Sequence, residues 1–116
     1  MNADDLHEVL NRATETLTTE LKSWIDPAAD EDIEKIAIAC MTLRNQDGGV
    51  VIFGYNDDGS PCTAPDVDVR KAYEPDVLQG LVSKYAHSPL EIEIHFVERK
   101  GHEYPVVVVP AGDAHQ

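Results

Sequence analysis

The stretch Gly48-Gly49-Val50-Val51-Ile52-Phe53-Gly54 is the part of the sequence that decides the fold. A continuous apolar run bounded by glycines is typical of a β-strand that is covered on both faces, as central strands are. The two leading glycines also end the helical pattern before them, because glycine is the usual residue just past a helix C-terminus. The run therefore predicts a central strand in which Val51 and Phe53 are buried.

The segments on either side of this run predict the rest of a sheet and about three helices. Apolar residues at helical spacing predict helices over residues 4–13, 30–44 and 73–85. For the long middle helix, Asp30 or Asp32 is the expected N-cap. Alternating residues predict further strands over residues 17–24, 90–98 and 104–109. This order predicts a single α+β domain over residues 1–116, with a mixed sheet on which the helix over residues 30–44 packs.

The charge balance restricts the partners that the surface can bind. Nine Lys and Arg residues stand against 22 Asp and Glu residues, so the 116-residue chain carries a net charge of −13. Such a surface repels phosphate backbones, and nucleic-acid binding would need a local basic patch, bound metal ions or a basic partner. The acidity also has a simpler explanation, because net charge keeps a small domain soluble.

The sequence predicts a cytoplasmic protein. Its two cysteines, Cys40 and Cys62, are too few for a disulfide framework, and the acidic N-terminus lacks the apolar core of a secretory signal. No apolar run approaches the ~20 residues that a membrane span needs. A P-loop is excluded, since the chain lacks Gly-x-x-x-x-Gly-Lys-Ser/Thr, and the histidines show no zinc-ligand spacing.

Several short motifs together resemble those of one known family. These motifs are Glu20-Leu21-Lys22 on the expected first strand, Asn45-Gln46-Asp47-Gly48-Gly49 at the helix end, and Asp57-Asp58-Gly59 after the glycine-bounded strand. Their order and spacing resemble the Schlafen-type AlbA-like domain over roughly residues 15–110. Two positions depart from the family pattern: Leu21 replaces an aromatic residue, and Gln46 replaces a common threonine.

The resemblance implies a nucleic-acid-associated domain, often attached to helicase-like or winged-helix partners in bacterial regulators. In animal members it implies a metal-dependent endoribonuclease. By this resemblance, Glu15, Glu20 and Asp58 would be the catalytic residues and the ligands of Mg²⁺ or Mn²⁺. Asp57 is the alternative to Asp58, which is chosen because it directly precedes the turn glycine. Lys22 would contact the scissile phosphate.

The residues themselves leave plainer interpretations open. Glu15 and Glu20 are five positions apart, so they converge only if the chain kinks between them at a helix-to-strand junction. Otherwise Glu15 ends a helix in solvent, while Glu20 and Lys22 face outward from a strand. Asp57 and Asp58 are also ordinary turn formers.

Two further basic residues, Arg99 and Lys100, fall at the tip of the expected C-terminal hairpin. A basic hairpin tip can enter a nucleic-acid groove, but hairpin tips are also charged simply because they are exposed. Weak RNA or DNA binding by the isolated domain is therefore one hypothesis.

The alternatives are a non-catalytic interaction module, as a homodimer or beside partner domains, and a nucleotide-binding regulator. Because the family often continues beyond the last strand, we expect a longer native protein than the chain that stops at Gln116.

Overall fold

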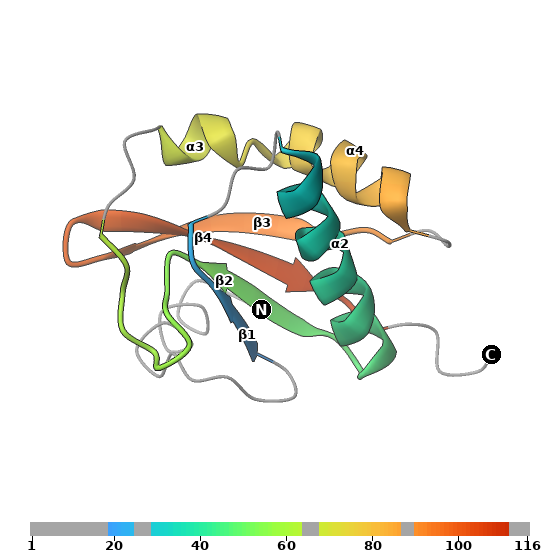
Figure 1. Ribbon diagram of the computed structural model, residues 1–116, viewed down its shortest axis with the longest axis horizontal. Helices are drawn as coiled ribbons and strands as arrows, with labels where there is room; N and C mark the ends of the chain where they lie inside the picture. Colours follow the sequence, from blue (N-terminus) through green and yellow to red (C-terminus); the bar gives the residue numbers. More distant parts are fainter. Residues whose placement is uncertain (1–18, 25–28, 64–67, 87–89, 112–116) are drawn as a thin grey trace.

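The computed structural model describes residues 19–24, 29–63, 68–86 and 90–111, which form one sheet with helices on one of its faces (Figure 1). In chain order the elements are β1 (Thr19–Lys22), α2 (Asp30–Asn45), β2 (Gly49–Phe53), α3 (Val69–Ala72), α4 (Pro75–Tyr85), β3 (Glu93–Arg99) and β4 (His102–Val109). The helix expected over residues 4–13 lies outside the described residues. No helix among the described residues is long and apolar enough to cross a membrane.

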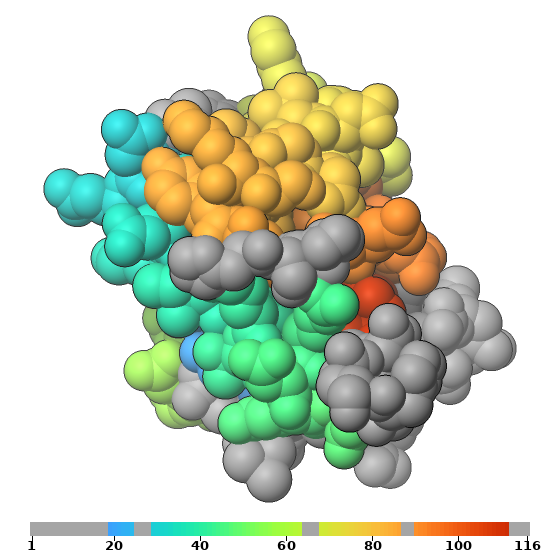
Figure 2. Space-filling model, turned by 90° about the vertical axis from the view of Figure 1, so that its right-hand side faces the viewer, coloured from blue at the N-terminus to red at the C-terminus, as the bar shows by residue number. Residues whose placement is uncertain are grey.

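The sheet is mixed, which confirms the predicted fold class. Its strand order is β1-β2-β4-β3, with β1 parallel to β2 and with β4 antiparallel to both of its neighbours. Parallel neighbours need a crossover connection, and α2 supplies it between β1 and β2. In Figure 2, α4 (orange) and α2 (teal to green) lie side by side on the outer surface, in keeping with their mutual packing.

Strand β2 is central and is buried on both faces, as its sequence predicts. Val51 and Phe53 are fully buried in the cluster that the helices cover, which also contains the buried residues of α2 and α4. Val50 and Ile52 point the other way, into a second cluster formed by residues of the strands and of the β2–α3 connection. Strand β2 therefore presents no polar side chain on either face of the sheet.

The N-terminus of α2 differs from the expectation. Neither Asp30 nor Asp32 is the N-cap; that position is taken by Ala29, which makes no side-chain cap. The two aspartates lie with Glu31 in the first turn instead, where carboxylates face the positive end of the helix dipole. Charge therefore stabilises this terminus in place of a side-chain hydrogen bond.

The segment before α4 also differs from the expectation. The helix expected over residues 73–85 begins at Pro75, because the Glu74 carboxylate caps it by accepting a hydrogen bond from the Val77 amide at 2.9 Å. Tyr73 instead ends the one-turn helix α3, which the sequence pattern did not indicate. A four-residue helix offers too few positions for helical periodicity to be recognised.

Gly54 ends β2 against the ring of Trp24, which follows β1. Its φ of +88° favours glycine, and a Cβ there would lie 2.6 Å from Trp24 Cζ2. The indole stacks on Tyr104 at a centroid distance of 5.9 Å, and its Nε1 donates a hydrogen bond to the Thr63 carbonyl at 2.8 Å. The Gly54–Trp24 contact therefore links the ends of β1 and β2 to the loop that follows them.

We expect Gly54→Ala to destabilise the fold by about 2–4 kcal/mol, from left-handed backbone strain together with overpacking against Trp24. The matched control is Gly80→Ala within α4, where an added Cβ meets nothing within 4 Å. The control should stabilise the protein by about 0.5–1 kcal/mol, because alanine favours the helix. Urea unfolding curves would measure both changes, and equal stability of the two variants would contradict the prediction.

Candidate functional site in the cleft between β1 and α2

Side chains of β1 and α2 enclose a cleft of about 420 Å³ at one edge of the sheet. Its position follows from strand alternation: Leu21 points into the second cluster, so Glu20 and Lys22 project toward α2. The residues that line the cleft are Glu20, Lys22, Lys35, Ile38, Ala39, Thr42, Leu43 and Gln46. Two of the expected site residues, Glu20 and Lys22, therefore lie in the same cleft.

The cleft combines an apolar floor with charged walls. Ala39 and Leu43 are buried, while the Glu20 carboxylate lies 3.4 Å from the Lys22 ammonium. Both of these side chains are partly exposed, so their ion pair contributes little to stability and can rearrange around a ligand. Lys35 adds a second ammonium from the α2 side. An anionic group with an adjoining apolar part fits such an arrangement.

The α2 wall was not identified from the sequence. Lys35, Ile38, Thr42 and Gln46 recur at the three- and four-residue steps that place side chains on one helix face. Ile38 is the signal that could have revealed this face, because it lies outside the buried stripe and is 52% exposed. The Thr42 hydroxyl donates to the Ile38 carbonyl at 2.8 Å, which leaves its lone pairs as acceptors.

Asp58 does not line the cleft; it lies in the turn that follows β2. Its Oδ1 accepts hydrogen bonds from the Ser60 amide at 2.9 Å and from the Ser60 hydroxyl at 2.5 Å. These bonds lower the pKa of the exposed Asp58 carboxyl. Asp57 is exposed in the same turn, and Gly59 has a φ of +88°. Both aspartates thus serve the turn, and Glu15 lies outside the described residues.

The metal site implied by the resemblance needs three carboxylates close together. Within residues 19–24, 29–63, 68–86 and 90–111, no three His, Cys, Asp or Glu side chains are grouped to hold a metal ion. Glu20 pairs with Lys22 in the cleft, whereas Asp58 accepts a hydrogen bond from Ser60 in the turn after β2. These residues alone do not make a metal centre, and binding by Glu15, Glu20 and Asp58 stays a prediction.

Arg99 and Lys100 form the tip of the β3–β4 hairpin, as expected, and lie outside the lining of the cleft. Lys100 and Gly101 have φ values of 52° and 83°, the positive values that a two-residue hairpin turn requires. Burial raises the pKa of the Tyr104 hydroxyl, and the nearby positive charge of Arg99 opposes this shift. Arg99 therefore lies by the sheet aromatics, while Lys100 is exposed at the tip.

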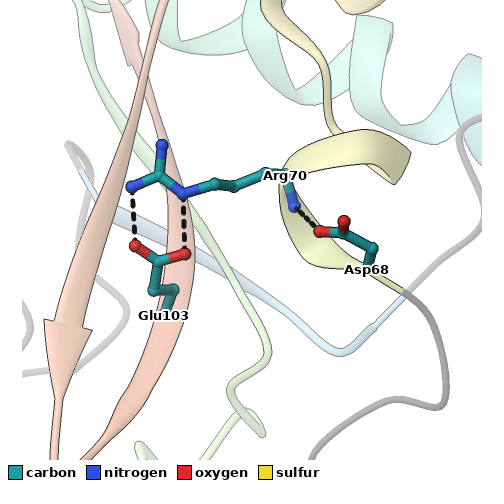
Figure 3. Close-up of polar contacts among 3 residues, drawn as sticks. All are labelled: Asp68, Arg70 and Glu103. Atoms are coloured by element: carbon teal, nitrogen blue, oxygen red, sulfur yellow. Dashed lines mark hydrogen bonds and ion pairs between the residues drawn. The ribbon is translucent and has the colours of Figure 1, made fainter.

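A bidentate ion pair fixes α3 onto this hairpin (Figure 3). Arg70 Nε and one terminal nitrogen donate to the Glu103 carboxylate at 2.8 and 2.7 Å, and the Arg70 guanidinium lies 5.0 Å from the Phe96 ring centroid. Asp68 caps α3 by accepting from the Arg70 amide at 3.0 Å. Glu98 stands directly opposite Glu103, so Arg70 also offsets the repulsion of two like charges.

The Arg70–Glu103 pair predicts a specific pH dependence of stability. Hydrogen bonds from Arg70 lower the pKa of the Glu103 carboxyl from its ordinary 4.5. The stability that such a carboxyl contributes is present above the ordinary pKa and is lost as pH falls through the lowered value. We therefore expect Arg70→Gln to lower the Tm at neutral pH, and its Tm curve to converge with that of the wild type at acid pH.

Circular dichroism melts between about pH 7 and about pH 2 would measure this convergence. Lys71→Gln is the matched control, since it removes the same charge one position further along α3. Its curve should stay parallel to that of the wild type. Parallel curves for Arg70→Gln as well would show that the Glu103 pair contributes nothing.

Comparison with known proteins shows which families and folds this chain resembles. Residues 15–116 match the protein family described as Schlafen, AlbA_2. None of the curated proteins compared is a match. The whole chain is similar, at 26% identity and a TM-score of 0.50, to the N-terminal domain of a Nitrosomonas europaea protein named for its relation to the ATP-dependent DNA helicase RecG, and it covers 78% of that chain.

A second likeness concerns the fold alone. Over 94% of its length the chain resembles the crystal structure of the DIP2311 protein of Corynebacterium diphtheriae, at 17% identity and a TM-score of 0.59. It spans 25% of that longer protein. The family match covers most of the sequence and includes the Glu20, Lys22 and Asp58 motifs. The chain therefore belongs to the Schlafen AlbA_2 family.

Proposed function

We propose that this chain is a nucleic-acid-associated domain that binds single-stranded RNA or DNA in the β1–α2 cleft. One observation carries the proposal: two of the nine basic residues, Lys22 and Lys35, converge on one cleft from separate elements. In a chain with 22 acidic residues, such a local pair of lysines supports binding of a phosphate backbone, because each ammonium can neutralise a phosphate. The family and the similarity to a domain of a helicase-related protein support this assignment.

The dimensions of the cleft favour single strands over duplexes. Its volume of about 420 Å³ lies near the lower end of the range for small-molecule pockets, and this size suits one or a few nucleotides of a single strand. Ile38, half-exposed beside the lysines, offers an apolar surface to the face of an unstacked base. A duplex keeps its base faces stacked and so offers no base face to Ile38.

We expect weak binding that depends strongly on salt. Neutralising two phosphates of a single strand gives a slope of about −1.4 in a plot of log Kobs against log salt concentration. Lys35→Ala should weaken binding and reduce the slope to about −0.7. Fluorescence anisotropy with a labelled oligonucleotide would measure both slopes. Lys71→Ala, a lysine of α3 outside the cleft, is the control and should change the slope little.

Tight binding that does not vary with salt would contradict the proposal. Glu20→Ala gives an independent check in the opposite direction. Because the Glu20 carboxylate pairs with Lys22, its removal frees one ammonium and takes a negative charge out of the cleft. We therefore expect this variant to bind more tightly than the wild type.

Metal-dependent RNA cleavage is the second candidate function. The position of Glu20 beside Lys22 in the cleft favours it, since the family resemblance assigns Glu20 to catalysis and Lys22 to contact with the scissile phosphate. Cleavage would also require Glu15 and Asp58 to reach Glu20. Cleavage therefore requires more residues to come together than binding does.

If the second candidate is right, wild type should cleave tRNA with Mn²⁺ and lose this activity with chelator. Glu20→Ala and Asp58→Ala should abolish cleavage while remaining folded, because both carboxylates lie outside the core. Gel electrophoresis of the RNA products would measure the activity. Equal residual cleavage in wild type and Glu20→Ala would assign it to a contaminant, and no cleavage by wild type would leave binding as the function.

A further inference from the structure

Strand β3 forms the edge of the sheet opposite the cleft. Among the described residues it pairs with β4 alone, in an unbroken antiparallel register over all seven of its residues, Glu93 to Arg99. It contains neither a proline nor a bulge, two of the devices that keep edge strands from pairing with other chains. In Figure 1, β3 runs along the margin of the sheet, below α3 and α4.

The first part of the helix-side face of β3, Ile94 and Phe96, is apolar and only partly covered, and Glu98 follows on the same face. Ile94 and Phe96 pack against the core from this strand, yet both remain half-buried. Arg70 lies over the Phe96 ring from α3, at 5.0 Å from its centroid. A further strand beside β3 would cover the remaining flank of these two side chains, and so would satisfy the edge and bury apolar surface together.

The charges of β3 are complementary to those of β3 itself. When an antiparallel strand pairs with its own copy over its full length, the first residue faces the last and the middle residue faces itself. In β3 this places Glu93 opposite Arg99 of the second copy, twice by symmetry, and Phe96 opposite Phe96. Glu98 faces Ile94 of the second copy, so no two like charges stand directly opposite each other.

From this pattern we propose that β3 pairs with β3 of a second copy of this chain, giving a two-fold dimer with one continuous eight-stranded sheet. A second copy is favoured over an unrelated strand because the same seven residues supply both the acidic and the basic end. The Glu93 side chain is 72% exposed and lies 3.5 Å from His95 Nε2 of its own strand, so contact with Arg99 of the second copy would add to this pair or replace it. Arg99 keeps its neighbours within its own sheet, and pairing with Glu93 adds to them.

A single pair of strands buries less surface than a standard stable interface, so the dimer is expected to be reversible and concentration-dependent. Sedimentation velocity on the whole chain should show a mass that rises from 12.8 kDa toward twice that value with increasing protein concentration. A constant mass of 12.8 kDa up to millimolar protein would overturn the proposal.

Charge reversal identifies the register. Glu93→Arg places two arginines opposite each other, and Arg99→Glu places two glutamates there, so each variant alone should be monomeric. An equimolar mixture of the two variants restores both opposite-charge pairs and should form a heterodimer. The double variant Glu93→Arg/Arg99→Glu should also dimerise. Failure of the mixture and of the double variant to associate would overturn the pairing of these residues.

Two further measurements keep the test decisive. Glu31→Arg reverses an exposed charge on α2, away from β3, and should leave dimerisation unchanged. If Arg99→Glu does not fold, Glu93→Arg and amide hydrogen exchange of the wild type carry the test. Protection of the outward-facing β3 amides should then rise with wild-type concentration but not with that of Glu93→Arg, and equal protection in both proteins would overturn the proposal.

Discussion

The burial of β2 on both faces is the constraint from which the rest of this structure follows. A strand with no polar face must have a neighbour on each side and a covered layer above and below it. Strands β1 and β4 take the two neighbouring positions, and α2 and α4 cover one face. Because β1 runs parallel to β2, the chain must cross over between them, and α2 is consequently carried to the side of the sheet where the cleft lies.

Features that depend on local pattern could be predicted from the sequence. The run from Val50 to Phe53 and the stripe of α2 gave the mixed sheet and the packed helix, because burial imposes a period on the side chains. Features that depend on neighbours distant in the chain could not be predicted. The cap of α2 and the one-turn helix α3 are examples, since tertiary packing decides short elements and helix ends.

The candidate site divides in the same way. Glu20 and Lys22 were found through a motif, because alternation along β1 puts them on one face whatever lies opposite. Lys35 and Ile38 were missed, since only the placement of α2 beside the edge strand turns them into a wall of the cleft. Asp58 shows the limit of motif reasoning: its position in the turn was right, yet its carboxylate bonds to Ser60 rather than entering the cleft.

The two edges of the sheet can act independently, because the cleft lies at β1 and the proposed pairing surface at β3. In an eight-stranded dimer the two β1 strands would lie at opposite ends, about 34 Å apart at ordinary strand spacing. A nucleic-acid strand bound in one cleft would then be held at a high local concentration near the other cleft, and this would favour its binding there too. If both proposals hold, such a dimer would raise the affinity of this acidic domain for a nucleic-acid strand without a broad basic surface, which its net charge of −13 disfavours.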